Sequence, residues 1–394
     1  MRWRAAYLVL PLLAALTLLL HNLPLFLFTG LLTLAAGATE VWARYCLAGV
    51  RYTRRVGADR LACGEETELW VEVANAKPLP LAWLRVEDEL SAGLTLVDAA
   101  LEASSSPQTR TLVQFLSLRW YERVRRRYRL VGAQRGAHQL GPARLASGDL
   151  FGLRTQSAVA PETQTVLVYP RVVPVAALNL RPARPYGEGR AARRILTDPL
   201  RVAGARPYLP GDSLRHIHWN ATARQGALQT KRFEPSADPH LIIALNAQTL
   251  DWAQGGVRLE LFEQGITAAA SLACAALEAG RPVGLLSNGA LGASQWRVRV
   301  PPARHSGQAA RLLELLAQLT VYTLAPFDTV LTTELPRLPY GASLLIITAL
   351  LNDSLRAALL AERAHGHPLT VIKLGPPPEA EAGLPADVLL YHLP

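Results

Sequence analysis

The sequence predicts a C-terminal α/β domain, preceded by a β-sandwich and by an N-terminal pair of transmembrane helices. Three observations lead to this fold class. Residues 5–39 carry no charged side chain, residues 50–170 alternate polar and apolar side chains, and the remainder alternates short apolar strands with helical stretches. A chain of 394 residues has room for two or three domains.

The uncharged N-terminal stretch is too long for one membrane-spanning helix. It has 35 residues, whereas a bilayer crossing needs about 20. A polar break occurs at residues 21–24, where Asn22 is suited to cap a new helix and Pro24 to its first turn. We therefore expect residues 1–45 to form a transmembrane hairpin, with helices at roughly 4–20 and 24–42.

Arginine placement predicts the orientation. Arg2 and Arg4 precede the first predicted helix, and four arginines between 44 and 55 follow the second. The positive-inside rule then predicts a multi-pass protein of the cell (inner) membrane, with a lipid bilayer around the hairpin and the soluble domains in the cytoplasm. Cleavage of a signal peptide at residues 36–38 is the competing interpretation. The uncharged run is about twice the length of a signal core, which favours the anchor.

Residues 50–170 are expected to form the β-sandwich. Residues 68–73 and 84–87 alternate in the manner of half-buried strands, and 111–118 and 119–130 are further candidate strands. Gly136, Gly141 and the glycines of 147–153 suggest backbone positions that would not tolerate a side chain.

Six arginines between 119 and 129 permit two interpretations. They form either a basic strip for lipid headgroups or nucleic acid, or an ordinary solvated strand face. Only three of the 41 basic residues are lysine, an arginine bias typical of genome composition. The net charge of +10 is therefore not taken as evidence for nucleic-acid binding, and a basic protein beside anionic lipid needs no further explanation. We favour the solvated face and expect no nucleic-acid partner.

Residues 171–205 are expected to be a linker, and residues 206–394 an α/β domain. Strands are predicted at 241–245, 282–287, 343–348, 369–373 and 388–391, with helices at 257–279, 307–319 and 353–365. Ligands of parallel sheets bind at the carboxyl ends of strands. Residues 246–249 and 352–353 are therefore expected beside any binding site.

The stretch 206–234 carries the most unusual pattern in the chain. Residues 210–212 predict a turn, Asp212 a cap for a short helix at 213–218, and 228–233 an extended segment. The candidate interaction residues are Arg206, Tyr208, Pro210, Gly211, Asp212, Arg215, Trp219, Arg224, Lys231 and Glu234. Arg215 and Arg224 are expected to form a buried ion network with Asp212 and Glu234, and this interpretation is favoured over catalysis.

These residues resemble the signature of the domain of unknown function 58 (DUF58) family, R-x-Y-x-P-G-D-x-x-R-x-I-D-W-x-x-S/T-A-R, followed by a lysine and a glutamate. His218 departs from it, because the signature has aspartate there. The resemblance implies a von Willebrand factor A-like (Rossmann-like) C-terminal domain. It also implies a partner, an AAA+ ATPase of the MoxR type.

A metal site of the von Willebrand A kind would need the pattern D-x-S-x-S after the first strand. This chain has Asn246-Ala247-Gln248-Thr249-Leu250, and a neutral amide holds Mg²⁺ poorly. The positions Asn246 and Gln248 are thus degenerate, and no metal or other cofactor is expected. The pairs His216/His218 and His365/His367 lack a completing cysteine or carboxylate.

The three cysteines form no CxxC pair, and the sequence has no P-loop, nucleophile elbow or HExxH motif. We therefore expect no catalytic activity. The predicted function is that of a membrane-anchored interaction or adaptor protein working with a MoxR-type ATPase. The alternative is a metal-dependent ligand-binding module. Whether the signature stretch is an interface or a structural clasp stays open.

Overall fold

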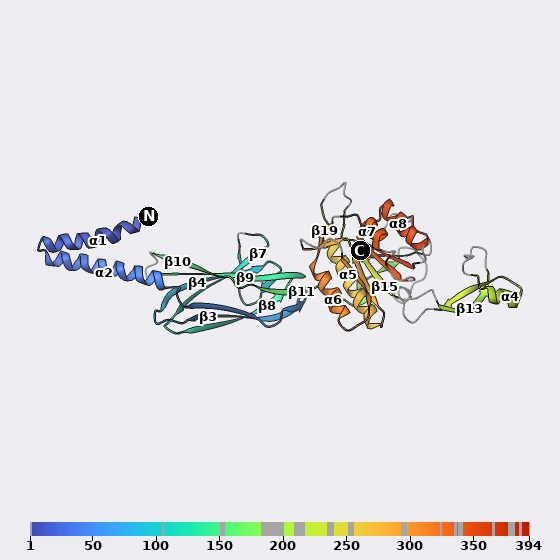
Figure 1. Ribbon diagram of the computed structural model, residues 1–394, viewed down its shortest axis with the longest axis horizontal. Helices are drawn as coiled ribbons and strands as arrows, with labels where there is room; N and C mark the ends of the chain where they lie inside the picture. Colours follow the sequence, from blue (N-terminus) through green and yellow to red (C-terminus); the bar gives the residue numbers. More distant parts are fainter. Residues whose placement is uncertain are drawn as a thin grey trace. The chain divides into compact units, whose positions relative to one another are not determined.

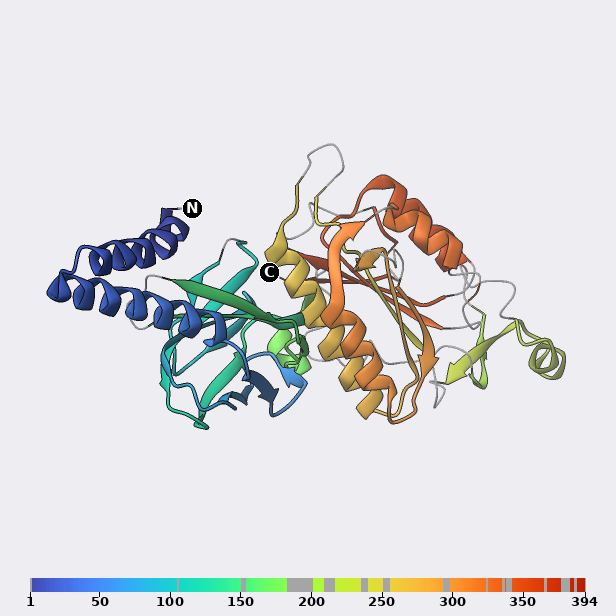
Figure 2. The same cartoon turned by 60° about the vertical axis from the view of Figure 1, so that its left-hand side comes forward.

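The computed structural model forms two compact units, Met1–Val168 and Tyr169–Pro394, which are described separately (Figures 1 and 2). The structure describes residues 2–104, 106–149, 154–182, 201–208, 217–234, 240–250, 256–292, 298–323, 325–334, 337, 342–364, 367–376, 383–385 and 388–393.

The first unit begins with two helices, α1 (Arg2–Leu19) and α2 (Leu23–Tyr45). Asn22 caps α2 by accepting a hydrogen bond at Oδ1 from the Leu25 backbone N–H, at 3.3 Å. The helices touch through the hydroxyls of Thr17 and Thr29, whose oxygens are 3.3 Å apart.

The predicted transmembrane hairpin is wrong, because α2 is the one helix among the described residues that is long and apolar enough to cross a membrane. The first helix has 18 residues and contains Pro11, and its first turn carries Arg2 and Arg4. Its uncharged part, residues 5–19, rises only about 22 Å, which is short of a hydrocarbon core of about 30 Å.

Two sheets follow, in the orders β1-β3-β8-β5 and β2-β11-β9-β4-β7-β6, with β10 paired to β9. We call them the β unit. The strands are β1 (Val50–Val56), β2 (Arg60–Ala62), β3 (Glu66–Asn75), β4 (Leu81–Ser91), β5 (Leu94–Leu96), β6 (Glu102–Ala103), β7 (Thr109–Leu118), β8 (Arg123–Gly132), β9 (Gly136–Gly148), β10 (Thr155–Ala160) and β11 (Gln164–Tyr169).

The β unit is held together by one core that draws side chains from both sheets. In β3 the alternating residues Leu69, Val71 and Val73 are buried, and in β4 Val86 and Leu90 face the same core. This is the alternation of a sheet with one buried and one solvated face.

Glycines meet their predicted role here. Gly136 has φ +139° and Gly141 has φ +91°, where side chains are rarely accommodated. A Cβ on Gly141 would lie 2.6 Å from the Glu162 carbonyl oxygen and would also collide with the Arg54 guanidinium.

The second unit is built on a sheet in the order β12-β22-β21-β20-β15-β16-β18. Its strands are β12 (Arg181–Pro182), β15 (Leu241–Leu245), β16 (Val283–Ser287), β18 (Val298–Ala303), β20 (Ser343–Thr348), β21 (Leu369–Leu374) and β22 (Leu389–Leu393). Two further strands, β17 (Gly289–Leu291) and β19 (Leu319–Thr323), pair with each other.

Helices cover both faces of this sheet (Figure 2). They are α5 (Leu259–Glu278), α6 (Gln308–Gln318), α7 (Phe327–Glu334) and α8 (Asp353–Ala364). In β15, Ile243 and Leu245 pack in the core that contains α5 and α6, whereas Ile242 and Ala244 pack in the core that contains α7 and α8. The predicted helices 257–279, 307–319 and 353–365 are confirmed to within two residues.

The five predicted strands, β15, β16, β20, β21 and β22, do pair in parallel. The predicted wholly parallel, von Willebrand factor A-like (Rossmann-like) sheet is nevertheless wrong, because the sheet is mixed. β12 and β18 run antiparallel to their neighbours. Only ten residues, 288–297, join β16 to β18. That length is too short for the helical crossover that a parallel pair requires, so the chain folds straight back.

Within the stretch expected to be a linker, the short helix η1 (Val175–Leu178) and β12 belong to the second unit. Leu178 is buried in its core, and the backbone N–H of Val173 donates to Ser271 Oγ at 3.0 Å. A separate hairpin consists of β13 (Arg201–Pro207) and β14 (Gln229–Glu234), with α4 (Trp219–Gln225) between them in sequence.

Candidate functional site

A pocket of about 170 Å³ lies at the carboxyl ends of β15 and β20; we call it the carboxyl-edge pocket. From β15 the chain crosses to β16 on one side, whereas β20 lies on the other. Such a switch point is where open α/β sheets bind ligands. The lining residues are Asn246, Gln248, Pro326, Phe327, Asp328, Leu350, Asn352, Ser354 and Leu355.

Buried amides hold the strand ends in place. Asn246 Nδ2 donates to Thr348 Oγ1 at 3.1 Å, which joins β15 to β20, and Asn246 Oδ1 accepts from the Gln248 backbone N–H at 3.0 Å. Asn288 Oδ1 accepts from the Ala247 backbone N–H at 2.8 Å, which joins β15 to the end of β16. The sequence predicts that residues 246–249 and 352–353 lie beside a binding site. The structure brings Asn246, Gln248 and Asn352 of these segments into one pocket.

The side-chain amide of Asn352 fixes the start of α8, which forms another part of the pocket lining. Asn352 Oδ1 accepts from the Leu355 backbone N–H at 3.1 Å and from Ser354 Oγ at 3.2 Å, so it caps the start of α8. The start of α7 supplies Phe327 and Asp328 to the same pocket. Among the described residues that line the pocket, Asp328 is the single ionisable one.

This donor set is a poor fit for a divalent cation. The oxygens of Asn246 and Asn352 already accept backbone hydrogen bonds, and one carboxylate does not make a Mg²⁺ site. Over the described part of the chain, no three His, Cys, Asp or Glu side chains gather as metal ligands would. The metal-dependent alternative therefore gains no support, and the pocket suits a neutral polar group.

Four of the ten signature residues, Pro210, Gly211, Asp212 and Arg215, lie outside the described residues, as does the helix expected at 213–218. Three lie on the hairpin strands, where Arg206 is the register partner of Thr230, Ala205 of Lys231, and Arg201 of Glu234. The remaining three, Tyr208, Trp219 and Arg224, lie on or beside α4 and its hairpin.

The helix α4 explains why histidine can replace the aspartate of the signature. His218 Nδ1 accepts a hydrogen bond from the Ala221 backbone N–H at 3.2 Å, which is the task of an N-capping side chain. Thr222 Oγ1 accepts from the Gln229 backbone N–H at 3.0 Å and ties α4 to β14. None of the α4 residues is buried, and Trp219 is 66% exposed.

Of the second histidine pair in the sequence, His365/His367, the structure describes one member. His367 is buried, and its Nδ1 donates to the Ala342 carbonyl at 3.1 Å. Its sequence partner His365, like His216, lies outside the described residues.

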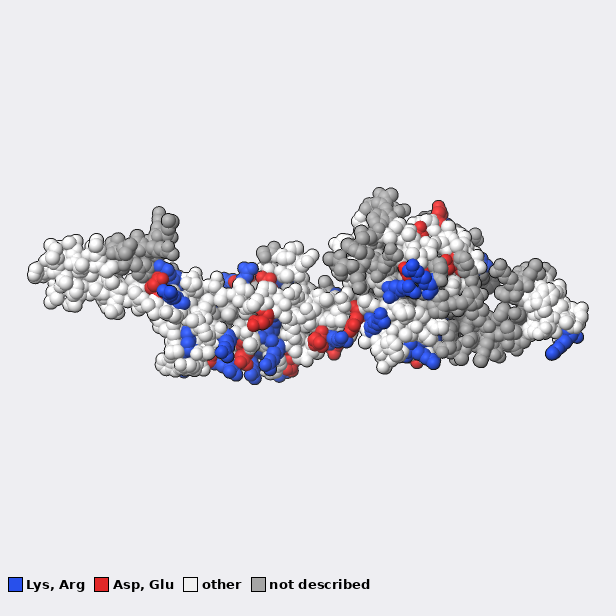
Figure 3. All heavy atoms as spheres, in the orientation of Figure 1, with Lys and Arg blue, Asp and Glu red and all other residues white. Residues whose placement is uncertain are grey.

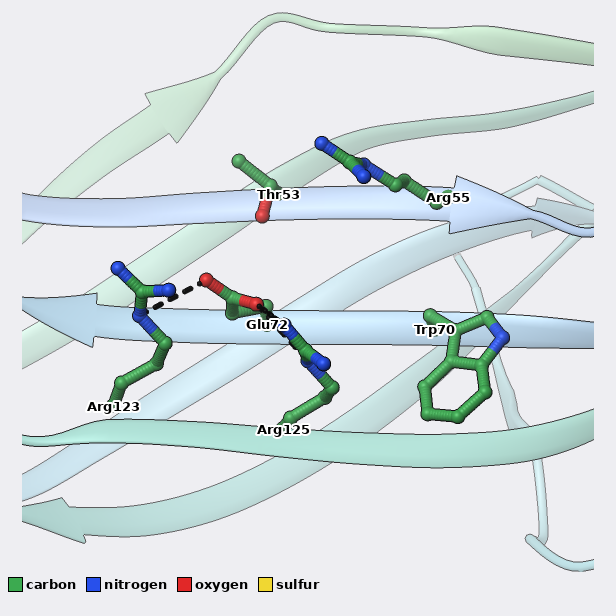
Figure 4. Close-up of a pocket in the computed structure, with 6 residues that line it drawn as sticks. All are labelled: Thr53, Arg55, Trp70, Glu72, Arg123 and Arg125. Carbon is green, nitrogen blue, oxygen red and sulfur yellow. Dashed lines mark hydrogen bonds and ion pairs between the residues drawn. The ribbon is translucent and has the colours of Figure 1, made fainter.

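A second pocket, of about 480 Å³, lies on the solvated face of β1, β3 and β8 (Figure 4). Glu72 stands between two arginines, with Arg125 Nη2 at 2.8 Å and Arg123 Nε at 3.2 Å from its oxygens. The Arg125 hydrogen bond holds the pKa of Glu72 below its ordinary value. Beside them, Arg127 stacks over Trp70 at 5.4 Å from the ring centroid.

These contacts agree with the solvated-face interpretation of the arginine run. Arg127 pairs with Glu68, and Arg129 lies 2.9 Å from Asp98, so four of the six arginines, Arg123 and Arg125 included, meet an acid from a neighbouring strand or loop. Figure 3 shows acidic and basic side chains interspersed over this part of the surface.

A buried ionic cluster, which the sequence reading missed, joins the two sheets of the β unit. Tyr52 Oη donates to Asp88 Oδ2 at 2.5 Å, and the Arg54 guanidinium pairs with Asp88 Oδ1. Arg54 also donates to the Leu140 and Glu162 carbonyls at 2.8 and 2.9 Å. The alternation of β4 could have predicted the burial of Asp88, because Asp88 lies two residues from both Val86 and Leu90 and so on the same, buried face of the strand.

Comparison of the sequence with known proteins finds an uncharacterised relative. A Bacillus subtilis protein described as "Uncharacterized protein YeaD" is 26% identical over 269 residues, which are 68% of this chain. The matched region covers 60% of the length of that relative.

Similarity to solved structures is low. The CARDB domain of a Pyrococcus furiosus protein matches with a TM-score of 0.21 and 14% identity over 30% of this chain and 91% of that one. Trypsin-activated alpha-2-macroglobulin from Escherichia coli matches with a TM-score of 0.23 and 16% identity; the match covers 43% of this chain and 9% of that one. Scores this low establish no shared fold. The family described as "Protein of unknown function DUF58" matches residues 204–387, and the chain is therefore similar to that family over α4 and the carboxyl-edge pocket.

Proposed function

We propose that this chain is a membrane-anchored interaction protein, held in a bilayer by α2 and binding a protein partner through its second unit, without catalytic chemistry of its own. The observation that carries the proposal is the surface of α2. Its side chains Leu23, Leu31 and Leu34 are 63%, 66% and 72% exposed, and residues 23–39 carry no charge.

A helix that is apolar and exposed along its length is unstable in water but matches lipid. Figure 3 shows the visible surface of α2 free of charged side chains until its end near the β unit. Burying such side chains contributes about 25 cal/mol per Å² of apolar surface, so the lipid environment strongly favours this helix.

The proposed orientation places the β unit and the second unit in the cytoplasm. Arg44, Arg51 and Arg55 follow the apolar part of α2, whereas residues 5–39 before them contain no charge. The positive-inside rule counts basic residues close to a span, so the side that follows α2 is expected to stay inside.

The partner surface is proposed to include α4. Trp219 is exposed on a helix that buries none of its own residues, and Leu228, 47% exposed, follows on the same hairpin. Exposed tryptophans commonly become the energetic anchors of protein interfaces. Because these residues fall in the segment that resembles the DUF58 signature, the expected partner is a MoxR-type AAA+ ATPase.

A pull-down of the full-length protein from its native membranes in mild detergent, with and without ATP, tests this proposal by mass spectrometry. We expect recovery of an AAA+ ATPase with the wild type and its loss with Trp219→Ala. Trp120→Ala is a matched control, since Trp120 is 65% exposed but lies in the first unit. Equal recovery with both variants would remove α4 from the interface, and absence of any ATPase would overturn the partner.

A further inference from the structure

The end of α2 is built into the β unit rather than joined to it by a loose connection. Cys46 is buried in the core of the β unit, with 0% exposure, and Trp42 and Leu47 pack against that core; Ala43 is 2% exposed. Glu40 pairs with Arg154 at 3.0 Å. Lys77 Nζ donates to the Cys46 carbonyl at 2.5 Å and so satisfies a helix-end acceptor.

The turn between β7 and β8, residues 119–122, is tied to the same place. Asn75 Nδ2 donates to the Arg119 carbonyl at 2.9 Å, and the Tyr121 backbone N–H donates to the Lys77 carbonyl at 3.2 Å. A short chain of hydrogen bonds therefore runs from the end of α2 through Lys77 to this turn.

The turn presents two large aromatic side chains to solvent. Trp120 is 65% and Tyr121 is 69% exposed, and Arg119 and Arg123 flank them. Tyr121 adopts φ +53°, a conformation that is rare for a bulky residue. Neither ring lies in the core of the β unit, so their exposure has no evident structural purpose.

The height of the turn matches the surface of a bilayer crossed by α2. The uncharged part of α2, residues 23–39, rises about 25 Å, close to the hydrocarbon thickness of about 30 Å. Cys46 lies six residues beyond Glu40, or about 9 Å further along the helix direction. That distance is at the outer margin of a headgroup layer about 5–8 Å thick, within reach of a tryptophan side chain.

We propose that Trp120 and Tyr121 form a second membrane contact, an aromatic foot that rests in the headgroup layer beside α2. Rings with one polar end prefer this layer, and the flanking arginines favour the anionic headgroups of the inner leaflet. With α2 clamped to the β unit, the foot fixes the tilt of that unit on the membrane. This inference rests on the proposed anchoring by α2.

Lipid-based quenching of tryptophan fluorescence tests the foot. The full-length protein is reconstituted into vesicles of phosphatidylglycerol and phosphatidylcholine, the latter brominated near the carbonyl end of its chains. Flotation of the vesicles is measured first. We expect brominated lipid to quench Trp120, so that Trp120→Phe lowers the amount of fluorescence that brominated lipid removes by the share of one tryptophan. Circular dichroism checks that the variant is folded.

Trp70→Phe is the matched control in the same unit. Trp70 lies on β3 five residues from Asn75, or about 17 Å along the strand, and Arg127 covers its ring. Its replacement should leave the amount of fluorescence that brominated lipid removes unchanged. Protein that fails to float would overturn both the anchoring and the foot. Protein that floats, with equal quenching in wild type and Trp120→Phe, would overturn the foot alone and assign the two rings to a protein contact.

Discussion

At the scale of single residues, the cluster of Tyr52, Arg54 and Asp88 contains the most buried ion pair described for the β unit. The side chains of Arg54 and Asp88 are 4% and 0% exposed. Burial raises the pKa of the Asp88 carboxyl, while the Arg54 guanidinium acts in the opposite direction. A buried pair of this kind contributes little net stability when intact, but losing one partner leaves an uncompensated charge.

Replacing Asp88 with asparagine is therefore expected to destabilise the β unit by about 3–5 kcal/mol, because the Arg54 guanidinium stays buried without its counter-ion. Denaturant unfolding followed by tryptophan fluorescence measures the loss. Asp98→Asn is the control, since Asp98 also pairs with an arginine but is 41% exposed. We expect that variant to unfold close to the wild-type midpoint, and an equal shift in both variants would contradict the role of burial.

At the scale of elements, β3 and β8 are linked by cross-strand ion pairs on their solvated face. Glu72 is the register partner of Arg125, and Trp70 of Arg127. A group whose pKa is lowered in the folded state stabilises that state above its unfolded pKa. For Glu72 this contribution is present above about pH 4.3 and is lost as the pH falls through the lowered folded value.

We expect NMR titration to find the Glu72 carboxyl titrating below the ordinary glutamate range, and high salt to move it back toward that range. Arg125→Gln should raise the Glu72 pKa, because it removes the main hydrogen bond to that carboxylate. Arg126→Gln is the control, since Arg126 is an exposed neighbour on β8 that is not among the causes of the shift. A Glu72 pKa that ignores both substitutions would contradict this account of the strand pair.

At the scale of the whole molecule, the first unit includes the end of α2 as well as the sheets. A chain that begins at Glu40 keeps the Arg154 ion pair and the buried side chains of Ala43 and Cys46, whereas one that begins at Ala48 lacks them. We expect the shorter chain to be less stable by about 2 kcal/mol, from lost apolar burial. Thermal or denaturant unfolding of the two water-soluble chains measures this difference.

Glu40→Gln in the longer chain separates the ion pair from the packing. The pair is partly exposed, so its removal should cost at most about 1 kcal/mol. Identical midpoints for the chains that begin at Glu40 and Ala48 would show that α2 ends outside the cooperative unit.

The sequence by itself determined what depends on local pattern. Charge-free length located α2, the alternation of apolar strands with longer helical stretches located α5 and α8, and uniformly apolar runs located β15 and β20. The carboxyl-end rule placed Asn246 and Asn352 beside one pocket, because it needs only strand order and direction. Gly141 was read as a position without room for a side chain, and its φ of +91° bears this out.

Only the tertiary structure decided what depends on contacts between distant segments. The return of β18 beside β16, the meeting of Asp88 with Arg54 across two sheets, and the link from α2 through Lys77 to Tyr121 each join residues 11 or more positions apart. Local periodicity carries no information on which strand becomes a neighbour, since pairing is settled by loop length and shared core packing. The number of membrane spans was misjudged for a related reason: an uncharged run was counted as two spans, although α1 is too short in its apolar part to be one.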